Sequence, residues 1–176
     1  MVFRAGDYVR HSSQPNWGIG RVLSLGEKGK VTIFFLRGGK RIIDTSYAQL
    51  EQVEDPHHPI LEIAGMANWN HANRNLYVIE LDPKVFEKEE RFIEANPHWI
   101  PGKLCVYVGL TGITPKERFH QHKRGEHAAG LVRKYGRHLL PEYYQHFNPL
   151  PYELGQAMEP ELARQLRADG LAVWQN

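Results

Sequence analysis

The feature that most constrains the fold is a change of pattern at residues 54–59, where the chain reads Glu-Asp-Pro-His-His-Pro. Before this segment, short apolar runs alternate with turn residues, which is typical of strand-rich folds. After it, apolar runs of strand length alternate with longer charged stretches that suit helices. A short, polar, proline-bearing segment is typical of a link between domains. We therefore expect two domains separated by residues 54–74, a linker and lead-in segment in which residues 60–66 could begin a helix that packs on the second domain.

The first domain, residues 1–53, is expected to be a small β unit. Its apolar runs lie at residues 7–10, 18–23, 30–35 and 40–44. The breaks between these runs carry glycine, proline and asparagine, which favour turns. Strands this short, at this spacing, predict a small five-stranded barrel in which residues 50–53 supply the last strand.

The residues that define this unit are Gly6–His11, Trp17–Val22 and Val31–Phe35. They resemble the pattern GDxVxH…WGxGxVxS…VxIxF of the SH3-like or Tudor-like barrels that occur at the C-terminus of UvrD-type helicases. Such barrels bind proteins, nucleic acids or no known partner, so the resemblance implies the fold and leaves the partner open. Trp17 and the stretch 37–41 are candidates for contact with such a partner, and Trp17 is equally suited to packing inside the barrel.

The second domain, residues 75–176, is expected to mix strands and helices. Strands are predicted at residues 76–81, 104–110 and 171–174, and helices at residues 83–95, 114–123, 131–135 and 161–167. Thr114 is expected to cap the second of these helices, with Pro115 at its first position and Gly125 after its last turn. Gly170 is expected to be the C-cap of the last helix.

Two tyrosines on successive strands and an arginine on the following helix form an unusual set. Tyr77 and Tyr107 lie in the predicted strands, and Arg118 lies in the predicted helix with His122 four residues later. Residues four apart share a helix face, so Arg118 and His122 are expected to point the same way. Such a cluster suits phosphodiester hydrolysis, because the phosphate needs a fixed guanidinium and the attacking water needs a proton acceptor.

The segments that carry this set are Leu76–Val78, Tyr107–Gly109, Leu110–Gly112 and Pro115–His122. They resemble the motifs of the GIY-YIG nuclease superfamily, whose members include homing endonucleases and the nuclease domain of UvrC. The resemblance covers about residues 75–176. Together with the first domain, it implies an α+β chain in which a small five-stranded SH3/Tudor-like β-barrel precedes a GIY-YIG-type α/β sandwich with a short central antiparallel sheet.

The resemblance also implies roles for the site residues. Tyr77 and Tyr107 would line the site, and one of them would orient or deprotonate the attacking water. Arg118 would hold the scissile phosphate. His122, with His120 as the lesser candidate, would assist proton transfer or bind phosphate. A glutamate on the late helix would hold one divalent ion, Mg2+ or Mn2+, which acts as a Lewis acid.

Two glutamates compete for the role of metal ligand. Glu159 stands three residues before Leu162 and would share its inward face. Glu161 would then lie on the solvent side, although the small Ala157 stands four positions earlier. Pro160 blurs the helical register, since it either starts or kinks the helix. We favour Glu159 and keep Glu161 as the alternative.

Basic residues gather between residues 101 and 140, which hold eight Lys/Arg against two Asp/Glu although the net charge of the chain is only +2. This local excess suits a surface that binds a polyanion, and a solvated basic surface that binds nothing has the same composition. The residues that we predict to contact nucleic acid are Gly109, Thr111, Lys116, His120, Lys123, Arg124, Arg133 and Lys134.

The composition, with 41% hydrophobic and 24% charged residues, is that of an ordinary globular protein. No apolar run is long enough to span a bilayer, and the N-terminus lacks the apolar stretch of a signal peptide, so we expect a cytoplasmic protein that does not contact membranes. The single cysteine, Cys105, excludes an intramolecular disulfide and is expected in the core. His57 and His58 are expected to be exposed rather than to bind a metal.

These observations favour a metal-dependent endonuclease that acts on single- or double-stranded DNA. The first domain would recruit it to DNA or to a repair or transcription protein. The first motif lacks the glycine of the family pattern, and the two strands are further apart in the sequence than is usual in the family. An inactive nucleic-acid-binding or adaptor protein built on the same fold is therefore the alternative. A protein-interaction module that depends on the first domain is the third hypothesis, and the pattern does not separate DNA from RNA.

Overall fold

The structure is a computed structural model that describes residues 2–54, 56–127 and 129–175. Its contacts divide the chain into two compact units, Met1–Asn70 and His71–Asn176. Both units contain helices and a sheet, so the chain is α+β as expected. The boundary lies after Asn70, and most of the segment predicted as a linker therefore belongs to the first unit.

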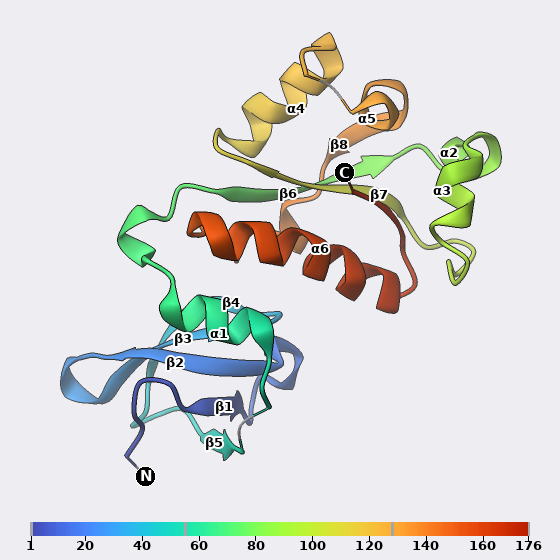
Figure 1. The fold of residues 1–176 in the computed structure, drawn as a ribbon. Coiled ribbons are helices and arrows are strands. Elements are labelled where there is room, and N and C mark those ends of the chain that lie inside the picture. Colours follow the sequence, from blue (N-terminus) through green and yellow to red (C-terminus); the bar gives the residue numbers. More distant parts are fainter. Residues whose placement is uncertain (1, 55, 128, 176) are drawn as a thin grey trace. The chain divides into compact units, whose positions relative to one another are not determined.

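The first unit is built on a five-stranded antiparallel sheet with the strand order β4-β3-β2-β1-β5 (Figure 1). Its strands are β1 (Tyr8–His11), β2 (Ile19–Leu25), β3 (Lys30–Phe35), β4 (Gly39–Asp44) and β5 (Leu50–Val53), with short 3-10 helices η1 (Pro15–Trp17) and η2 (Glu27–Gly29) between them. The five predicted strands are confirmed. Within the described ranges no pairing joins β4 to β5, so the closure of these strands into a barrel is not observed.

A helix that follows the sheet packs on it. This is α1 (Pro59–Met66), which contacts β2 and β3 and buries Ile60 and Leu61. Glu62 accepts a hydrogen bond from the hydroxyl of Tyr8 and pairs with Arg21 at 2.5 Å. The helix expected at residues 60–66 is therefore present, but it belongs to the first unit, because its apolar face and its glutamate both have partners on the first sheet.

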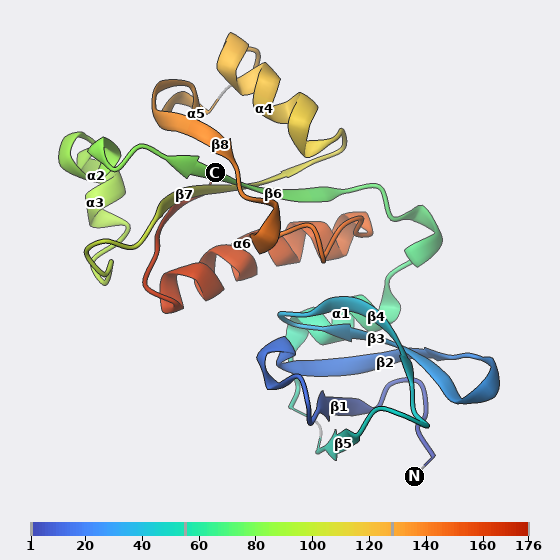
Figure 2. The same cartoon turned by 180° about the vertical axis from the view of Figure 1, so that it is seen from behind.

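The second unit is a four-stranded sheet with the order β8-β6-β7-β9 (Figure 2). β6 pairs antiparallel with β7 and β8, and β9 pairs parallel with β7. Its strands are β6 (Asn75–Leu81), β7 (Cys105–Thr111), β8 (Gly136–Leu139) and β9 (Ala172–Trp174), and its helices are α2 (Lys84–Lys88), α3 (Glu90–Glu94), α4 (Pro115–Arg124), α5 (Gly130–Tyr135) and α6 (Tyr152–Ala168), with η3 (Trp69–His71) before the unit and η4 (Pro141–Tyr143) within it.

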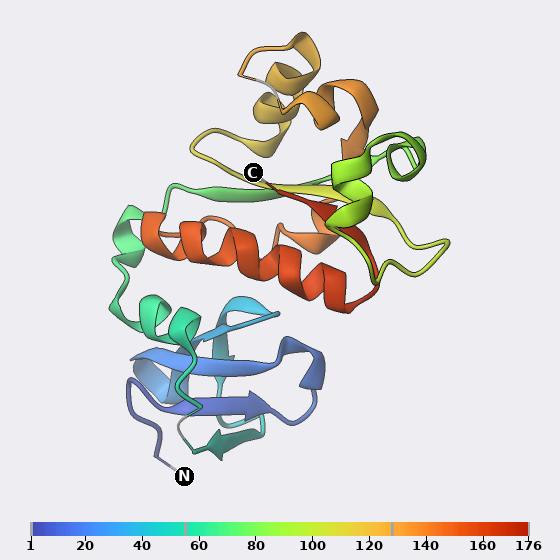
Figure 3. The same ribbon diagram turned by 45° about the vertical axis from the view of Figure 1, so that its right-hand side comes forward.

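Helices cover both faces of the second sheet. α4 and α5 lie over one face, and the long α6 lies along the other (Figure 1, Figure 3). The core consists of the alternating residues of β6 and β7 with the apolar stripe of α6, including Leu154, Met158 and Leu162, all of which are buried. In this three-layer arrangement, α4 and α6 contact the central strand β6 from opposite faces of the sheet.

The boundaries of the helices agree with the sequence where capping residues are strong. α4 begins at Pro115 after a capping box formed by Thr114 and Glu117, and Gly125 ends it in the left-handed conformation. The stretch 83–95, predicted as one helix, forms the two short helices α2 and α3 with Glu89 extended between them. β8 was not predicted, because its four residues carry no clear strand pattern.

α6 is longer than predicted. It spans Tyr152–Ala168, well beyond the stretch 161–167 through which a helix was expected, and it continues through Pro160. Its C-cap is Asp169 rather than Gly170, and Gly170 follows with a φ of 90°, a conformation that glycine adopts without strain. The apolar residues that it buries extend the helix past the proline, since packing on the sheet outweighs one lost backbone hydrogen bond.

Candidate active site

The two tyrosines of the predicted set lie side by side in the centre of the sheet. Tyr77 on β6 pairs with Gly109 on β7, and Ile79 pairs with Tyr107, so both tyrosines point to the same face. Their ring centroids are 6.0 Å apart, and they are 1% and 2% exposed. They face the side of the sheet that α4 and α5 cover.

Gly109 makes room for the first of these tyrosines. A Cβ atom placed on Gly109 would lie 2.5 Å from both Cζ and Oη of Tyr77, closer than real contacts permit. Gly109 is itself buried. The glycine of the Tyr-Val-Gly motif thus acts through packing, and the nucleic-acid contact expected of it stays a prediction.

His122 on α4 holds the hydroxyl of Tyr77 from above the sheet. It is fully buried, and its Nε2 lies 2.9 Å from the Tyr77 Oη. The backbone N–H of Ala129 donates to its Nδ1 at 3.1 Å. Since Nδ1 accepts, the proton of the neutral ring lies on Nε2, which therefore donates to the Tyr77 hydroxyl. Burial, with the nearby charge of Arg118, lowers the pKa of His122 to about 4, so the ring is neutral at pH 7.

The environments of the two tyrosines differ. Burial raises the pKa of Tyr77, but a hydrogen bond and the charge of Arg118, together with a hydrogen bond from Tyr107, oppose that rise. Burial also raises the pKa of Tyr107, and Tyr77 raises it further. Tyr77 is therefore the hydroxyl that ionises more readily, because its phenolate oxygen has several donors around it.

Arg118 lies at the border between this buried pair and the solvent. It is half-buried, one turn before His122 on α4. Its Nη1 donates to Oε1 of Gln121 at 3.1 Å, and its Nη2 donates to the carbonyl of His127 at 3.0 Å. These contacts hold the guanidinium close enough to the tyrosines to influence both pKa values.

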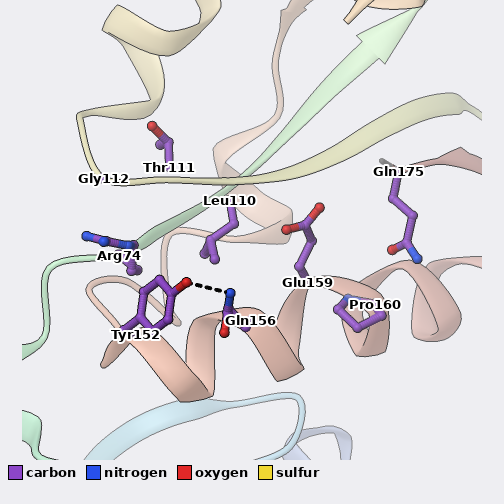
Figure 4. A pocket seen from close by; sticks show the side chains of 9 residues that line it. All are labelled: Arg74, Leu110, Thr111, Gly112, Tyr152, Gln156, Glu159, Pro160 and Gln175. Atoms are coloured by element: carbon purple, nitrogen blue, oxygen red, sulfur yellow. Dashed lines mark hydrogen bonds between the residues drawn. The ribbon is translucent and has the colours of Figure 1, made fainter.

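Glu159 approaches the same tyrosines from α6, on the opposite face of the sheet. β9 pairs only with Cys105–Tyr107, and Glu159 lies beside the part of β7 that follows. Figure 4 shows its carboxylate pointing from α6 toward the strand that carries Leu110. Its negative charge raises the pKa values of Tyr77 and Tyr107. Burial raises the pKa of Glu159 itself.

Glu161, the alternative metal ligand, is held elsewhere. Its carboxylate accepts hydrogen bonds from Arg164 at 2.7 and 2.8 Å and from Gln165 at 2.8 Å. Only 9% of the residue is exposed, so the expectation that it would lie on the solvent side is wrong. Glu161 falls on the buried stripe of α6, three residues after Met158 and four before Gln165, both of which are buried.

A cavity of about 480 Å³ opens beside Glu159 (Figure 4). It is lined by Arg74, Leu110, Thr111, Gly112, Tyr152, Gln156, Glu159, Pro160 and Gln175. Of these residues, the sequence analysis had singled out only Thr111 and Glu159 as site residues. Tyr152 and Gln156 were missed because they become neighbours of Glu159 only if α6 begins at Tyr152. Arg74 was missed because it precedes β6 and comes near Glu159 only through the tertiary fold.

The residues around Glu159 suit one hard cation rather than a cage of protein ligands. In the described part of the chain, no three His, Cys, Asp or Glu residues come together as a metal site. Magnesium is commonly bound through one or two carboxylates, with waters and substrate phosphates as the other ligands. A half-buried carboxylate at the edge of an open cavity fits that donor set.

The predicted nucleic-acid contacts have different fates. Lys123 donates to the carbonyl of Gly136 at 2.8 Å, Arg124 pairs with Glu126 at 2.8 Å, and Lys134 pairs with Glu89 at 2.7 Å. Thr111 is buried, and its hydroxyl accepts from the N–H of Ile113. All six predicted basic residues are exposed, namely Lys116, His120, Lys123, Arg124, Arg133 and Lys134, and three of them have the partners just named. Part of the basic excess is thus balanced within the protein.

Some expectations fall outside these contacts. Cys105 is buried with a pKa raised to about 11, mainly by burial, as expected for a core residue. Asn176, a candidate for the late asparagine of the family pattern, lies outside the described residues. In the part of the chain that the structure describes, no helix is long and apolar enough to cross a membrane.

Comparison with known proteins informs only the first unit. Residues 3–53 match the model of a family described as a protein of unknown function, DUF3553. No curated protein and no solved structure matches the chain. The match coincides with the five-stranded sheet and stops before α1, so the second unit has to be interpreted from its geometry.

Proposed function

We propose that the second unit is a metal-dependent endonuclease of the GIY-YIG type that hydrolyses phosphodiester bonds in DNA. The observation that carries the proposal is the cluster of Tyr77, Tyr107 and His122, with Arg118 on the same helix as His122 and Glu159 on α6 across the sheet. These residues come from two strands and from helices on opposite faces of the sheet, and Arg118 and Glu159 both influence the tyrosine hydroxyls. A guanidinium, a polarised phenol and a carboxylate are the groups that phosphodiester hydrolysis needs.

In the proposed reaction, the oxygen of a water attacks phosphorus and the bond to the leaving sugar oxygen breaks. Tyr77 first loses its own proton to bulk solvent and, as the phenolate, accepts the proton of that water, while the Nε2–H of His122 donates to the Tyr77 oxygen. Because burial raises the pKa of Tyr77, this phenolate is the minor form near pH 7. The released sugar oxygen takes a proton from solvent. Arg118 stabilises the negative charge that develops on the phosphate oxygens. Glu159 would hold the magnesium or manganese ion, which supplies Lewis-acid stabilisation of the leaving oxygen when bound.

The first unit is proposed to recruit this activity. Its sequence resembles the SH3/Tudor-like barrels, and it carries an edge where Trp17 lies against His11 and Phe35 with Arg41 over its ring at 5.1 Å. An aromatic side chain with a cation beside it suits contact with a protein or with DNA. Retention of DNA or of a repair or transcription protein by residues 1–70 alone would support this role.

A cleavage assay tests the proposal. We expect the wild-type chain to nick supercoiled plasmid and to cut oligonucleotides when Mg2+ or Mn2+ is present. Arg118→Ala and Glu159→Gln should each lower the rate by at least about 100-fold, the usual effect of losing one transition-state contact. Glu153→Gln is the matched control, since Glu153 is exposed on the first turn of the same helix. Thermal unfolding of each variant separates loss of activity from loss of fold.

The alternative is a nucleic-acid-binding protein without turnover. The burial of Tyr77 and Tyr107, which are 1% and 2% exposed, favours it, because an attacking water has to reach one of these hydroxyls. This alternative predicts salt-sensitive binding of DNA and no cleavage of any DNA form with either metal. Cleavage that Arg118→Ala or Glu159→Gln leaves unchanged would also refute the nuclease proposal.

A further inference from the structure

We propose that Arg74 and Tyr152 form a subsite for an unpaired nucleotide a few positions away from the scissile phosphate, so that the preferred substrates are single-stranded or carry a single-stranded flank. The inference rests on the proposed function and names its substrate class. It starts from the cavity beside Glu159, whose lining includes both residues.

Arg74 is placed at the mouth of this cavity by the backbone around it. It directly precedes β6, and its Nη1 donates to Oδ1 of Asn73 at 2.9 Å. A Cβ atom on Gly112 would lie 3.2 Å from Nη1 of Arg74, and one on Gly155 would lie 3.2 Å from its Cβ. These two glycines let Arg74 lie close to β7 and α6, where it lines the cavity that contains Glu159.

Tyr152 offers an aromatic ring beside that guanidinium. The Arg74 Cζ lies 5.0 Å from the ring centroid, and the residue remains 46% exposed. Its hydroxyl accepts a hydrogen bond from Nε2 of Gln156 at 2.7 Å, which holds the ring in place (Figure 4). An arginine stacked beside an exposed tyrosine is an arrangement on which a nucleobase stacks while the cation contacts the adjacent phosphate.

The helix connects this pair to Glu159. Tyr152, Gln156 and Glu159 stand at positions i, i+4 and i+7 of α6 and share one face. At a rise of about 1.5 Å per residue, Tyr152 and Glu159 are separated by about 10 Å along the axis, close to three steps of a nucleic-acid strand at about 3.4 Å each. A strand whose scissile phosphate lies at Glu159 therefore reaches Tyr152 a few nucleotides away.

The charges along the cavity determine where the phosphates of a bound nucleic-acid strand would lie. Among the lining residues, Arg74 is the one cation and Glu159 the one anion. A phosphate is stabilised next to Arg74, while at Glu159 a divalent ion has to lie between the carboxylate and the phosphate. A base in a duplex has both faces covered by its neighbours, whereas an unpaired base can stack on Tyr152. This difference is the reason for the single-strand preference.

Binding measured without metal tests the subsite independently of cleavage. The probe is a fluorescein-labelled oligonucleotide, single-stranded or annealed to its complement, titrated with the full chain in EDTA and followed by anisotropy. We expect Tyr152→Ala to raise the Kd for the single strand roughly 5- to 150-fold and the Kd for the duplex less than about twofold. Tyr152→Phe, which keeps the ring, should bind like the wild type. Arg74→Ala should make the salt dependence of single-strand binding shallower by about 0.7 in log–log slope.

Two controls match these changes. Tyr47→Ala removes a tyrosine that is 89% exposed in the first unit, and Arg91→Ala removes an exposed arginine on α3. Equal effects of Tyr152→Ala and Tyr47→Ala, equal weakening of single strand and duplex, or no binding by the wild type would overturn the subsite. If the Tyr152 effect is found and the wild type cuts no DNA, the subsite stands and the nuclease proposal fails. If the wild type cuts and Tyr152→Ala changes neither binding nor cleavage, the nuclease proposal stands and the subsite fails.

Discussion

Gly109→Ala is the substitution whose effect follows most directly from the geometry. The added Cβ would lie 2.5 Å from Cζ and Oη of Tyr77. The ring has no simple escape, because its hydroxyl is held by His122 at 2.9 Å and the residue is 1% exposed. The added methyl group therefore has to displace either the backbone of β7 or the ring of Tyr77.

The expected loss of stability follows from known cases of overpacking. Inserting a methyl group into a packed core costs about 1–3 kcal/mol. The unit His71–Asn176 is close to the size at which 1 kcal/mol shifts Tm by about 4 °C, so we expect Gly109→Ala to lower Tm by about 4–12 °C. Cleavage should fall as well, since the Tyr77 hydroxyl moves relative to Arg118.

Thermal and urea unfolding followed by circular dichroism measure this loss. Gly130→Ala is the control, because a Cβ on Gly130, the first residue of α5, meets nothing within 4 Å. Adding Gly109→Ala to a Tyr77→Leu background should destabilise much less, with a coupling energy of about 1 kcal/mol or more. A loss below about 0.5 kcal/mol, or equal losses in the two backgrounds, would refute the packing argument.

Three further predictions concern the buried groups. The pKa of His122 is about 4 in the folded chain and 6.5 in the unfolded chain, so the unfolded chain binds more protons between these values and stability should fall as pH drops from about 6.5 to 4. Urea unfolding across this range should show a flatter pH profile for His122→Gln than for the wild type. Parallel profiles would contradict the lowered pKa of His122. Tyr77→Phe should lower the cleavage rate more than Tyr107→Phe, because Tyr77 is the more readily ionised hydroxyl; single-turnover kinetics decide this, and the reverse order would assign the proton acceptor to Tyr107. Cys105 should react with a thiol reagent only when the second unit unfolds, since it is buried with a pKa of about 11; rapid labelling of the native chain would show that β7 opens locally.

Local signals in the sequence were sufficient for α4 and for the tyrosine pair. Thr114, Pro115, Glu117 and Gly125 are short-range capping residues, and the structure contains the helix that they predict. The alternation of apolar residues also placed Tyr77 and the residues around it on strands. These features depend on neighbours within a few positions, which a sequence pattern displays directly.

Other features depended on which surfaces meet in space. α6 begins at Tyr152 because its apolar face packs on the sheet, and this register buries Glu161 and turns Glu159 toward the cavity. α1 packs on the first unit because Arg21 and Tyr8 offer partners to Glu62. Arg21 and Tyr8 are both far from Glu62 in the sequence, so no local pattern predicts these contacts.

The sequence by itself determined the five strands of the first unit, the strands β6, β7 and β9, the cap of α4 and the residue types of the candidate site. Only the tertiary structure decided which of them share a site: that Glu159 and not Glu161 lines the cavity, that His122 donates to Tyr77, and that Arg74 and Tyr152 line the same cavity as Glu159. The physical reason is that capping and periodicity act over one or two turns, whereas burial and hydrogen bonding depend on distances between segments up to about a hundred residues apart.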